Sequence, residues 1–302
     1  MKLEFQSHAK CLLFGAHAVL RGSSALSCPV TRYHCKILWQ PQATLKKIQL
    51  TGVQGPHLQQ EVLQFLHYCL QLAQIDYHKF YGILHIENTI PIAQNLGSSA
   101  ALCLNVSKLF SALNFIDNKN IHNFAKKCEH YFHGTSSGFD IKACDCPEGH
   151  ILMYHQGQYE TIRPIWHPPL KLIPSPAVCH TKDAVLKVTR WQQQQPDNGK
   201  TTDLTMHNAC LLAFRALTQP TASVHMRHKW LQKALQDAQK CYTQWGLISP
   251  KLRKTITANQ AQMSATTPIG AGCGGFLLGL AKNSSINTDS SAVGNLIFHD
   301  CC

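Results

Sequence analysis

The 302-residue sequence lacks any uninterrupted apolar run of about eighteen residues, the length that a membrane-spanning helix requires. Its first ten residues, MKLEFQSHAK, include Glu4 and His8 and have no long apolar core, so we expect no secretory signal peptide. No internal repeat is visible. These absences predict a cytoplasmic protein with no membrane partner.

Paired CxxC motifs are also missing, although the chain has 14 cysteines. Such pairs are the usual ligands of structural zinc, so a zinc site of that kind is not expected. Cys144, Cys146 and His150 leave a partial metal site as an open alternative. In a chain without an export signal we expect the thiols to stay reduced. The terminal Cys301 and Cys302 are interpreted as a frayed tail.

Acidic residues are scarce, with 16 Asp and Glu against 28 Lys and Arg, and the formal net charge is +12. The basic residues are dispersed along the chain, which favours attraction of small anions over a nucleic-acid surface. We therefore expect a small-molecule partner and no nucleic acid. The length exceeds that of a typical single core, which predicts two domains, residues 1–160 and 161–302, with a turn-rich boundary at 156–170.

One stretch, residues 84–110, organises the rest of the chain. Alternating apolar residues at its start predict a strand that Pro91 ends, and a loop of small residues, 93–99, then opens a helix near Ala100. The free N–H groups and the positive dipole at a helix start attract anions. The hydroxyls of Ser98 and Ser99 suit either a helix cap or a metal-bound phosphate, and simple capping by Ser98 stays open.

The remaining elements follow from hydrophobic periodicity. Strands are predicted at 3–5, 10–14, 25–39, 48–53, 149–155, 170–174 and 177–180. Helices are predicted at 61–72, 121–132, 204–217, 226–241 and 251–263. The polar stretch 190–202, with four consecutive glutamines, is predicted to be a loop. A polar loop at 135–140 carries an acid, and a glycine-rich loop within 267–275 leads into an apolar strand.

Four motifs in order resemble the GHMP kinase superfamily and, within it, mevalonate kinases most closely. Residues 10–22 read KCLLFGAHAVLRG, where the family has a lysine, an apolar strand and FGEHAVV-G. Residues 90–101 read IPIAQNLGSSAA, similar to IP-x-x-x-GLGSSAA, and residues 129–140 read EHYFHGTSSGFD, similar to E-x-x-x-HG-x-x-SG-x-D. Residues 269–275, IGAGCGG, resemble a TGAGGGG loop, while HTKDAV (180–185) and GLISPKL (246–252) resemble weaker signatures. The resemblance covers residues 9–281.

The resemblance implies an α+β, two-domain GHMP kinase architecture. Its N-terminal ATP-binding domain would be ribosomal protein S5 domain 2-like and its C-terminal domain ferredoxin-like, with the site in the cleft between them. It also implies ATP-dependent phosphorylation of the primary hydroxyl of mevalonate to 5-phosphomevalonate, with ATP and Mg²⁺ as cofactors, in isoprenoid precursor biosynthesis. Phosphomevalonate kinase or another small-molecule kinase of the superfamily stays an alternative, as do a non-catalytic nucleotide-binding relative and a homodimer.

The resemblance also assigns roles to residues. Asp140 accepts or orients the proton of the substrate hydroxyl, Lys10 steadies the transferring phosphoryl group, and Ser99 and Glu129 hold Mg²⁺. The ATP phosphates are assigned to Asn95, Leu96, Gly97, Ser98, Ser99 and Ala100, in a loop that is not a Walker loop. The acceptor side is assigned to His17, Arg21, Thr181, Gly270, Ala271 and Gly272.

Each assignment has a structural alternative that the sequence leaves open. Lys10 alone suits a surface lysine at a strand start. Glu129, which follows two lysines on a helix, suits a solvated charge. Asp140 suits a turn or helix cap, and His133 suits a structural histidine with satisfied hydrogen bonds.

The sequence departs from the family pattern at four positions. Ala16 stands where the family has a glutamate, which removes a carboxylate. Asn95 replaces a glycine, and asparagine is the next best residue for positive φ. Ile269 replaces a hydroxyl residue and Cys273 replaces a glycine. The core lysine, glutamate and aspartate remain and favour a working kinase, whereas Ala16 and Ile269 are the reasons for keeping the non-catalytic alternative.

Overall fold

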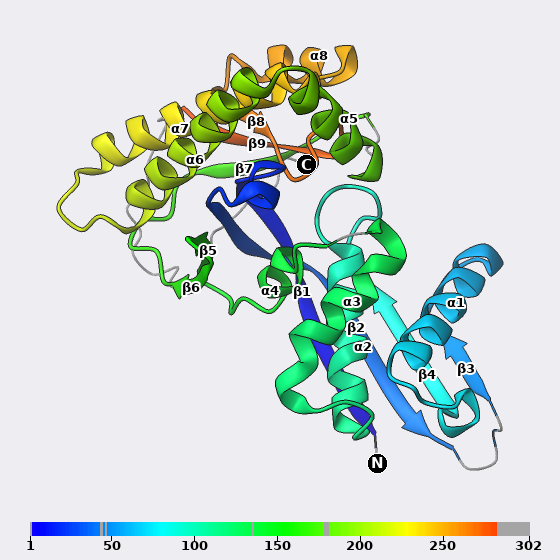
Figure 1. Ribbon diagram of the computed structural model, residues 1–302. Coiled ribbons are helices and arrows are strands. Elements are labelled where there is room, and N and C mark those ends of the chain that lie inside the picture. The colour runs from blue at the N-terminus through cyan, green and yellow to red at the C-terminus, as the bar shows by residue number, and fades with distance from the viewer. Residues whose placement is uncertain (1, 43–44, 46, 135, 178–180, 283–302) are drawn as a thin grey trace. The chain divides into compact units, whose positions relative to one another are not determined.

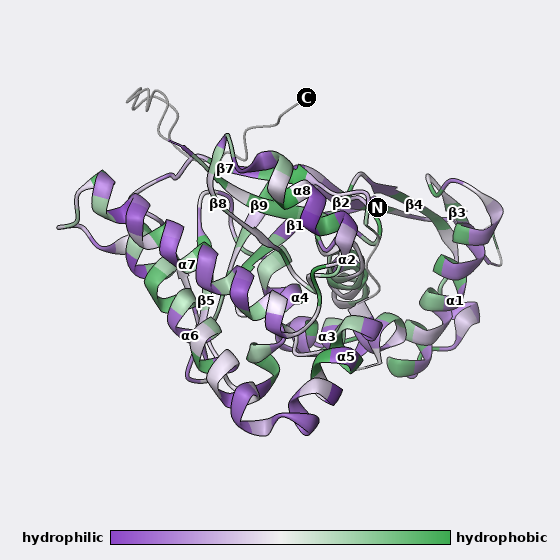
Figure 2. Ribbon diagram, turned by 90° about the horizontal axis from the view of Figure 1, so that it is seen from above, coloured by the Kyte–Doolittle hydropathy of each residue, from purple (hydrophilic) through white to green (hydrophobic). Residues whose placement is uncertain are grey.

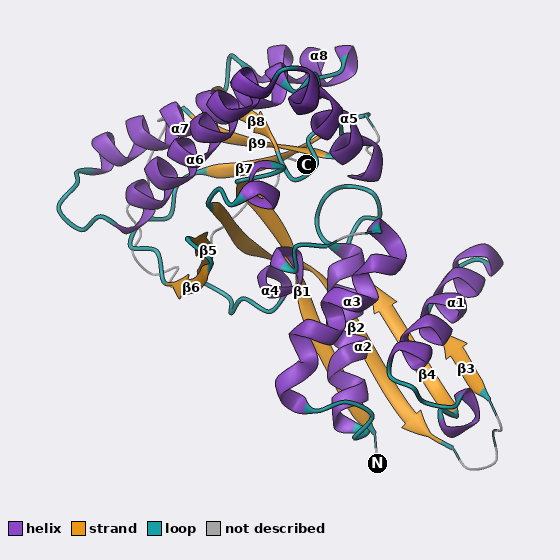
Figure 3. Cartoon of the chain, viewed as in Figure 1, coloured by secondary structure: helices purple, strands orange, loops and turns teal. Residues whose placement is uncertain are grey.

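A computed structural model describes residues 2–42, 45, 47–134, 136–177 and 181–282, which form two compact units (Figure 1). The first unit comprises Met1–Ala9, Thr31–Pro91 and Gly97–Asp145, and the second Lys10–Val30, Ile92–Leu96 and Cys146–Cys302. Both contain helices and strands (Figure 3), so the predicted α+β class is confirmed. Within the described ranges, no helix combines enough length with enough apolar character to cross a membrane.

Strands β1 (Leu3–Phe14) and β2 (Ala25–Pro41) contribute residues to both units. Each unit is therefore discontinuous in sequence. The sequence predicted two contiguous domains that meet near residue 160. The discontinuous units do not test that division, so it stays a prediction.

The first unit contains the sheet order β3-β4-β2, with β3 (Ile48–Thr51) parallel and β2 antiparallel to β4 (Gly82–Asn88). In the register, Ile37 pairs with Ile86 and Trp39 with Leu84, and all four are buried. Alternate residues of a strand point to the same face, so this period of two places the apolar side chains of both strands in one core.

Helices α1 (Pro56–Leu72), α2 (Ser98–Ala112), α3 (Ile121–His133) and α4 (Phe139–Cys144) complete the first unit, with the short turns η2 (Tyr77–Lys79) and η3 (Asn118–Asn120). Helix α2 contacts both α3 and α4. Phe80 stacks on Trp39 with 4.3 Å between ring centroids and meets Phe110 edge-on. Burial of each such side chain contributes roughly 1.5–3 kcal/mol, so this aromatic cluster anchors α2 by its C-terminal half.

The second unit contains an antiparallel sheet in the order β7-β9-β8, formed by Leu170–Pro174, Phe276–Ala281 and Met263–Pro268. Strands β5 (Ile151–His155) and β6 (Gln158–Ile162) form a hairpin, and β5 pairs with the start of β2. The turn η1 (Ala18–Arg21) follows β1.

Helices α5 (Thr181–Gln194), α6 (Pro196–Thr218), α7 (Val224–Gln244) and α8 (Pro250–Asn259) accompany this sheet. Helix α7 contacts α6 and β8. Its turns are both purple and green in Figure 2, as expected of an amphipathic helix, and Leu231, Ala234, Leu235 and Ala238 form the buried stripe.

The prediction of a loop at 190–202 is wrong. Helix α5 continues to Gln194 and α6 begins at Pro196, so only one residue separates them. Glutamine forms helices well, and proline at the first helical position lacks only an N–H that would be unpaired there anyway. Gly199 is buried in α6, where a Cβ would lie 3.2 Å from Gln192, so its small size allows close packing.

Smaller boundary predictions also need correction. The strands predicted at 3–5 and 10–14 are one strand, and the turn-rich stretch 156–170 contains β6. Strand β4 ends at Asn88, before Pro91, because the Asn88 side chain accepts the N–H of Ile90 and turns the chain. The last predicted helix ends at Asn259, and Met263 already begins β8.

Three sets of predicted residues lie outside the described part of the chain: Thr135, the 178–180 segment of a predicted strand, and Cys301 with Cys302.

Candidate functional site

The loop before α2 has an unusual backbone. Ala93, Asn95 and Gly97 have φ values of 58°, 65° and 81°, so the prediction that Asn95 can take positive φ is confirmed. Gly97 is the N-cap of α2 and no side chain caps this helix, so capping by Ser98 is wrong. The first intrahelical bond runs from the Ala101 N–H to the Gly97 carbonyl (2.9 Å). The N–H groups of residues 98–100 therefore precede the helical ladder, as an anion site requires.

The two serine hydroxyls at this helix start have defined neighbours in the first unit. The Asn88 amide donates to Ser98 Oγ at 2.8 Å. Ser99 Oγ lies 3.0 Å from His133 Nε2 on α3. Ser99 is thus held beside α3, the helix that carries Glu129 one turn before His133 on the same face.

Glu129 is only 3% exposed, so its alternative as a solvated charge is wrong. A buried carboxylate needs hydrogen-bond donors, and the Ser136 hydroxyl donates to Glu129 Oε2. Ser136 Oγ also accepts the N–H of Gly138 at 3.0 Å. Gly138 is the N-cap of α4, and Asp140 lies in the first turn of that helix, half-buried. Asp140, which was predicted on a loop, therefore lies on helix α4. Ser136 connects the buried Glu129 carboxylate to the start of that helix.

Lys10 belongs to the second unit and is 2% exposed, so its alternative as a surface lysine is wrong. Its backbone N–H donates to the Leu96 carbonyl at 3.0 Å. This bond joins β1 to the loop before α2, and so joins the first two sequence motifs.

The third glycine motif, residues 269–275, has its carbonyls held by buried side chains of the second unit. Tyr242 donates its O–H to the Gly270 carbonyl at 2.9 Å, and His17 donates Nε2–H to the Ala271 carbonyl at 3.0 Å. Gly272 has a φ of 84°, and a Cβ there would lie 2.2 Å from the Tyr242 ring. Only glycine fits this position. The Ile269 side chain is fully buried and packs into the interior.

His17 was predicted on the acceptor side and is held inside the second unit. Its ring meets Trp245 edge-on, with centroids 5.2 Å apart. Burial lowers the pKa of His17 from 6.5 to about 4, although the Ala271 carbonyl raises it in part. A neutral ring that donates to a loop carbonyl is a positioning group, and direct contact of His17 with an acceptor stays a prediction.

Arg21 is paired with a residue that the sequence did not single out. Its Nε and Nη2 donate to the two carboxylate oxygens of Asp203 on α6, at 2.6 and 2.8 Å. The Gln192 amide donates to the same carboxylate. The pair is separated by 182 residues and no motif surrounds Asp203, so no sequence signal indicated it. Ala16 carries no carboxylate, and the carboxylate that Arg21 binds comes from α6. Thr181 begins α5.

The described cysteines provide no metal centre. Ten of them are free and buried, including Cys144 and Cys146, whereas Cys273 is disulfide-bonded, contrary to the expectation of reduced thiols. Among the described residues no group of three or more His, Cys, Asp or Glu side chains can hold a metal ion, so the partial site with His150 is not supported.

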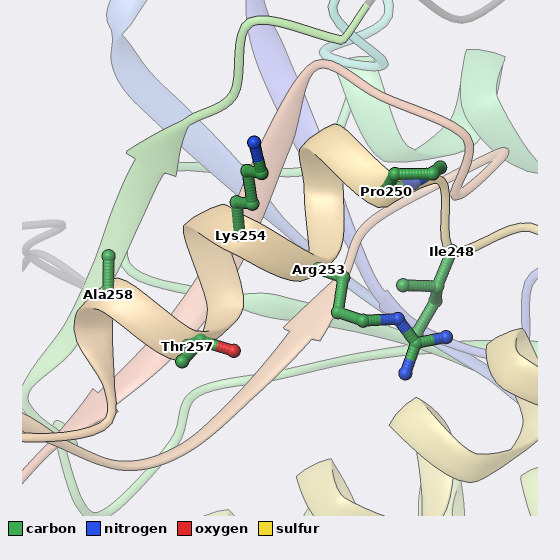
Figure 4. A pocket seen from close by; sticks show the side chains of 6 residues that line it. All are labelled: Ile248, Pro250, Arg253, Lys254, Thr257 and Ala258. Atoms are coloured by element: carbon green, nitrogen blue, oxygen red, sulfur yellow. The ribbon is translucent and has the colours of Figure 1, made fainter.

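A surface pocket of about 600 Å³ lies beside α8 and contains none of the predicted site residues. Its lining comprises Ile248, Pro250, Arg253, Lys254, Thr257 and Ala258. In Figure 4, Arg253 and Lys254 extend in opposite directions. Their charges do not converge, so the pocket lacks the features of an anion site.

Comparison with known proteins supports the sequence resemblance. Residues 60–146 match the family described as GHMP kinases N terminal domain. The mevalonate kinase of Pyrococcus horikoshii is 26% identical over 210 residues, which cover 63% of this chain and 62% of that protein. The mevalonate kinase of Thermococcus gammatolerans is 24% identical over 319 residues, covering 97% of this chain and 94% of that protein.

Solved structures share the fold at lower identity. The L. major mevalonate kinase in complex with R-mevalonate has a TM-score of 0.69 at 19% identity, covering 93% of this chain and 88% of that one. Lactococcus lactis galactokinase complexed with galactose has a TM-score of 0.72 at 16% identity, covering 93% and 85%. Kinases named for different acceptors thus share this fold, and the fold alone does not identify an acceptor.

Proposed function

We propose that the chain phosphorylates the hydroxyl of a small anionic alcohol with ATP, because residues 60–146 match the GHMP kinase N-terminal family and the chain is similar in sequence to mevalonate kinases. Mevalonate is the first candidate acceptor, and phosphorylation of its primary hydroxyl would give 5-phosphomevalonate for isoprenoid synthesis in the cytoplasm. The formal net charge of +12 supports an anionic acceptor.

The observation that carries the proposal is the connection between Glu129 and Asp140 in the first unit. Ser136 bonds both the buried Glu129 carboxylate and the N–H of Gly138, which caps the helix of Asp140. Two carboxylates in different surroundings are suited to different tasks. The buried one suits a cation, and the half-buried one suits the proton of a substrate.

The ATP phosphates would bind at the start of α2. The N–H groups of Ser98, Ser99 and Ala100 precede the first intrahelical hydrogen bond, and the helix dipole adds partial positive charge there. Positive φ at Asn95 and Gly97 turns the backbone into this helix start. Successive N–H groups in such a bend form a concave anion site.

Mg²⁺ would be held by Ser99 and Glu129. Both offer oxygen ligands, which this hard cation prefers. The contact of Ser99 Oγ with His133 Nε2 fixes the direction of the hydroxyl, and Ser136 fixes one oxygen of Glu129. When bound, the cation would neutralise negative charge on the phosphates.

Asp140 would accept or orient the proton of the acceptor hydroxyl, and Lys10 would steady the negative charge of the transferring phosphoryl group. Phosphoryl transfer depends mainly on positioning and charge neutralisation. Burial strengthens the electrostatic effect of Lys10, which is 2% exposed.

Two features favour mevalonate over its phosphorylated form and over a non-catalytic role. Both carboxylate oxygens of Asp203 already bind the Arg21 guanidinium, so Arg21 is not a ready partner for a second phosphate. The lysine, glutamate and aspartate of the family pattern are all present, as Lys10, Glu129 and Asp140, which favours a working kinase over a non-catalytic role.

The variant Asp140→Asn tests the proposal. We expect its turnover number to fall by at least about 100-fold, because general acid–base groups contribute factors of that order, while ATP affinity stays within about twofold. Asp237→Asn is the matched control, since the Asp237 carboxylate pairs with the surface lysines Lys233 and Lys240 of its own helix, α7. Full turnover in Asp140→Asn would remove Asp140 from the chemistry.

A further inference from the structure

Two of the departures from the family pattern meet in the second unit. The Asn95 amide donates to the Gly274 carbonyl at 2.9 Å and, more weakly, to the Ile269 carbonyl at 3.4 Å. Ile269 is itself a departure, and Gly274 directly follows a third, Cys273. The side chain that replaces a glycine in the loop before α2 therefore bonds both ends of the altered glycine loop.

The two loops are also packed without spare volume. A Cβ at Gly270 would lie 2.9 Å from Asn95 Cβ, and a Cβ at Gly275 would lie 2.7 Å from the Gln94 carbonyl oxygen. Both distances are shorter than side chains tolerate. Residues 94–95 thus contact the glycine loop near both of its ends, and a shift of one loop must move the other.

Two further carbonyls of the glycine loop accept hydrogen bonds from other side chains of the second unit. Tyr242 binds the Gly270 carbonyl and His17 binds the Ala271 carbonyl. On its other side, the loop before α2 is fixed to β1, because the Leu96 carbonyl accepts the backbone N–H of Lys10. The loop that contains Asn95 is therefore hydrogen-bonded both to the predicted catalytic residue Lys10 and to the glycine loop.

We propose that Asn95 is a positioning residue that fixes the glycine loop, residues 269–275, to the loop before α2. Its tolerance of positive φ replaces the conformational freedom of the family glycine, and its amide adds a hydrogen-bonded connection that glycine cannot make. The consequence for turnover rests on the proposed function, whereas the connection itself does not.

Hydrogen exchange and steady-state kinetics of Asn95→Gly test this. Glycine keeps the φ of 65° accessible and removes the side chain, both the amide that binds the glycine-loop carbonyls and the Cβ beside Gly270. We expect amide exchange in peptides covering 265–277 to accelerate at least about fivefold in the ligand-free protein, since a lost hydrogen bond has about that effect on an equilibrium. We expect kcat to fall about tenfold, with the KM for ATP changing less than twofold, because misplacement lowers the rate more than the binding.

Asn114→Gly is the matched control. Asn114 is exposed and has a φ of 58°, so this substitution makes the same chemical change in the same backbone conformation. It should leave both exchange at 265–277 and kcat unchanged. All samples are kept free of reductant, so that the disulfide at Cys273 is the same in each.

The outcomes separate this inference from the proposed function. Unchanged exchange in Asn95→Gly overturns the connection, whatever the enzyme does. Faster exchange with unchanged kcat reduces Asn95 to a structural residue and overturns the positioning role. Faster exchange in a protein whose wild type turns over no acid supports the connection and rejects the proposed function.

Discussion

At the scale of single residues, sequence patterns identified the polar groups but not their partners. The motifs pointed to Glu129 and Lys10, and both are buried, which only a functional or a well-bonded group tolerates. Asn95 was expected to accept positive φ and does. Ser136 and Asp203, which bond Glu129 and Arg21, were not predicted. A side-chain partner depends on where the fold brings distant residues, and a motif contains no such information.

The titration of His17 gives a prediction at this scale. Burial lowers its pKa from 6.5 to about 4, so between these values the unfolded chain binds a proton that the folded chain does not. The free energy of unfolding should therefore fall as the pH is lowered through this range, by about 3 kcal/mol from this group.

The variant His17→Gln keeps an N–H donor for the Ala271 carbonyl and does not titrate. Urea unfolding of both proteins between pH 7 and pH 4 measures the effect. We expect the wild type to lose about 3 kcal/mol more than the variant over this range. Parallel stability curves would show that His17 is protonated equally in the folded and unfolded states.

At the scale of elements, strongly periodic segments were predictable and polar ones were not. The apolar run of α2 and the alternation of β2 both appear where they were expected. The boundary between α5 and α6 was missed because a glutamine run followed by proline and glycine is typical of loops. Packing of Gly199 against Gln192 overrides that local preference, and only the tertiary structure shows it.

Three helices of the first unit meet at Asp145, which follows α4. Its carboxylate accepts hydrogen bonds from Lys108 on α2 at 2.6 Å and from His122 on α3 at 2.8 Å. The His122 hydrogen bond, followed by Lys108, holds the pKa of Asp145 well below its usual range. The ionised group therefore stabilises the fold above the pKa of the unfolded chain, and this contribution is lost in acid.

Asp145→Ala should lower the free energy of unfolding at pH 7 by about 2 kcal/mol, because both partners lose a charge-assisted hydrogen bond. Lys119→Ala removes a lysine that is 77% exposed and should change stability by less than about 0.5 kcal/mol. Chemical denaturation at pH 7 compares the two. Equal stability of Asp145→Ala and wild type would mean that this junction does not hold α2, α3 and α4 together.

At the scale of the whole molecule, composition and motif order were the informative features. The excess of basic residues and the four ordered motifs predicted an anion-binding α+β protein, and the fold class is confirmed. The interleaving of the two units could not be predicted, because β1 and β2 each supply residues to both. Dividing a sequence into consecutive segments assigns each strand to one domain, whereas β1 and β2 are each split between the two units.

The most direct test of the central claim is ADP release by the purified full chain from ATP and Mg²⁺. The acceptors are mevalonate and 5-phosphomevalonate in parallel, with an acceptor-free control. We predict turnover with mevalonate and none above the control with 5-phosphomevalonate. Silence with both acids despite measurable ATP binding, or turnover with the phosphorylated acid alone, would contradict the proposed function.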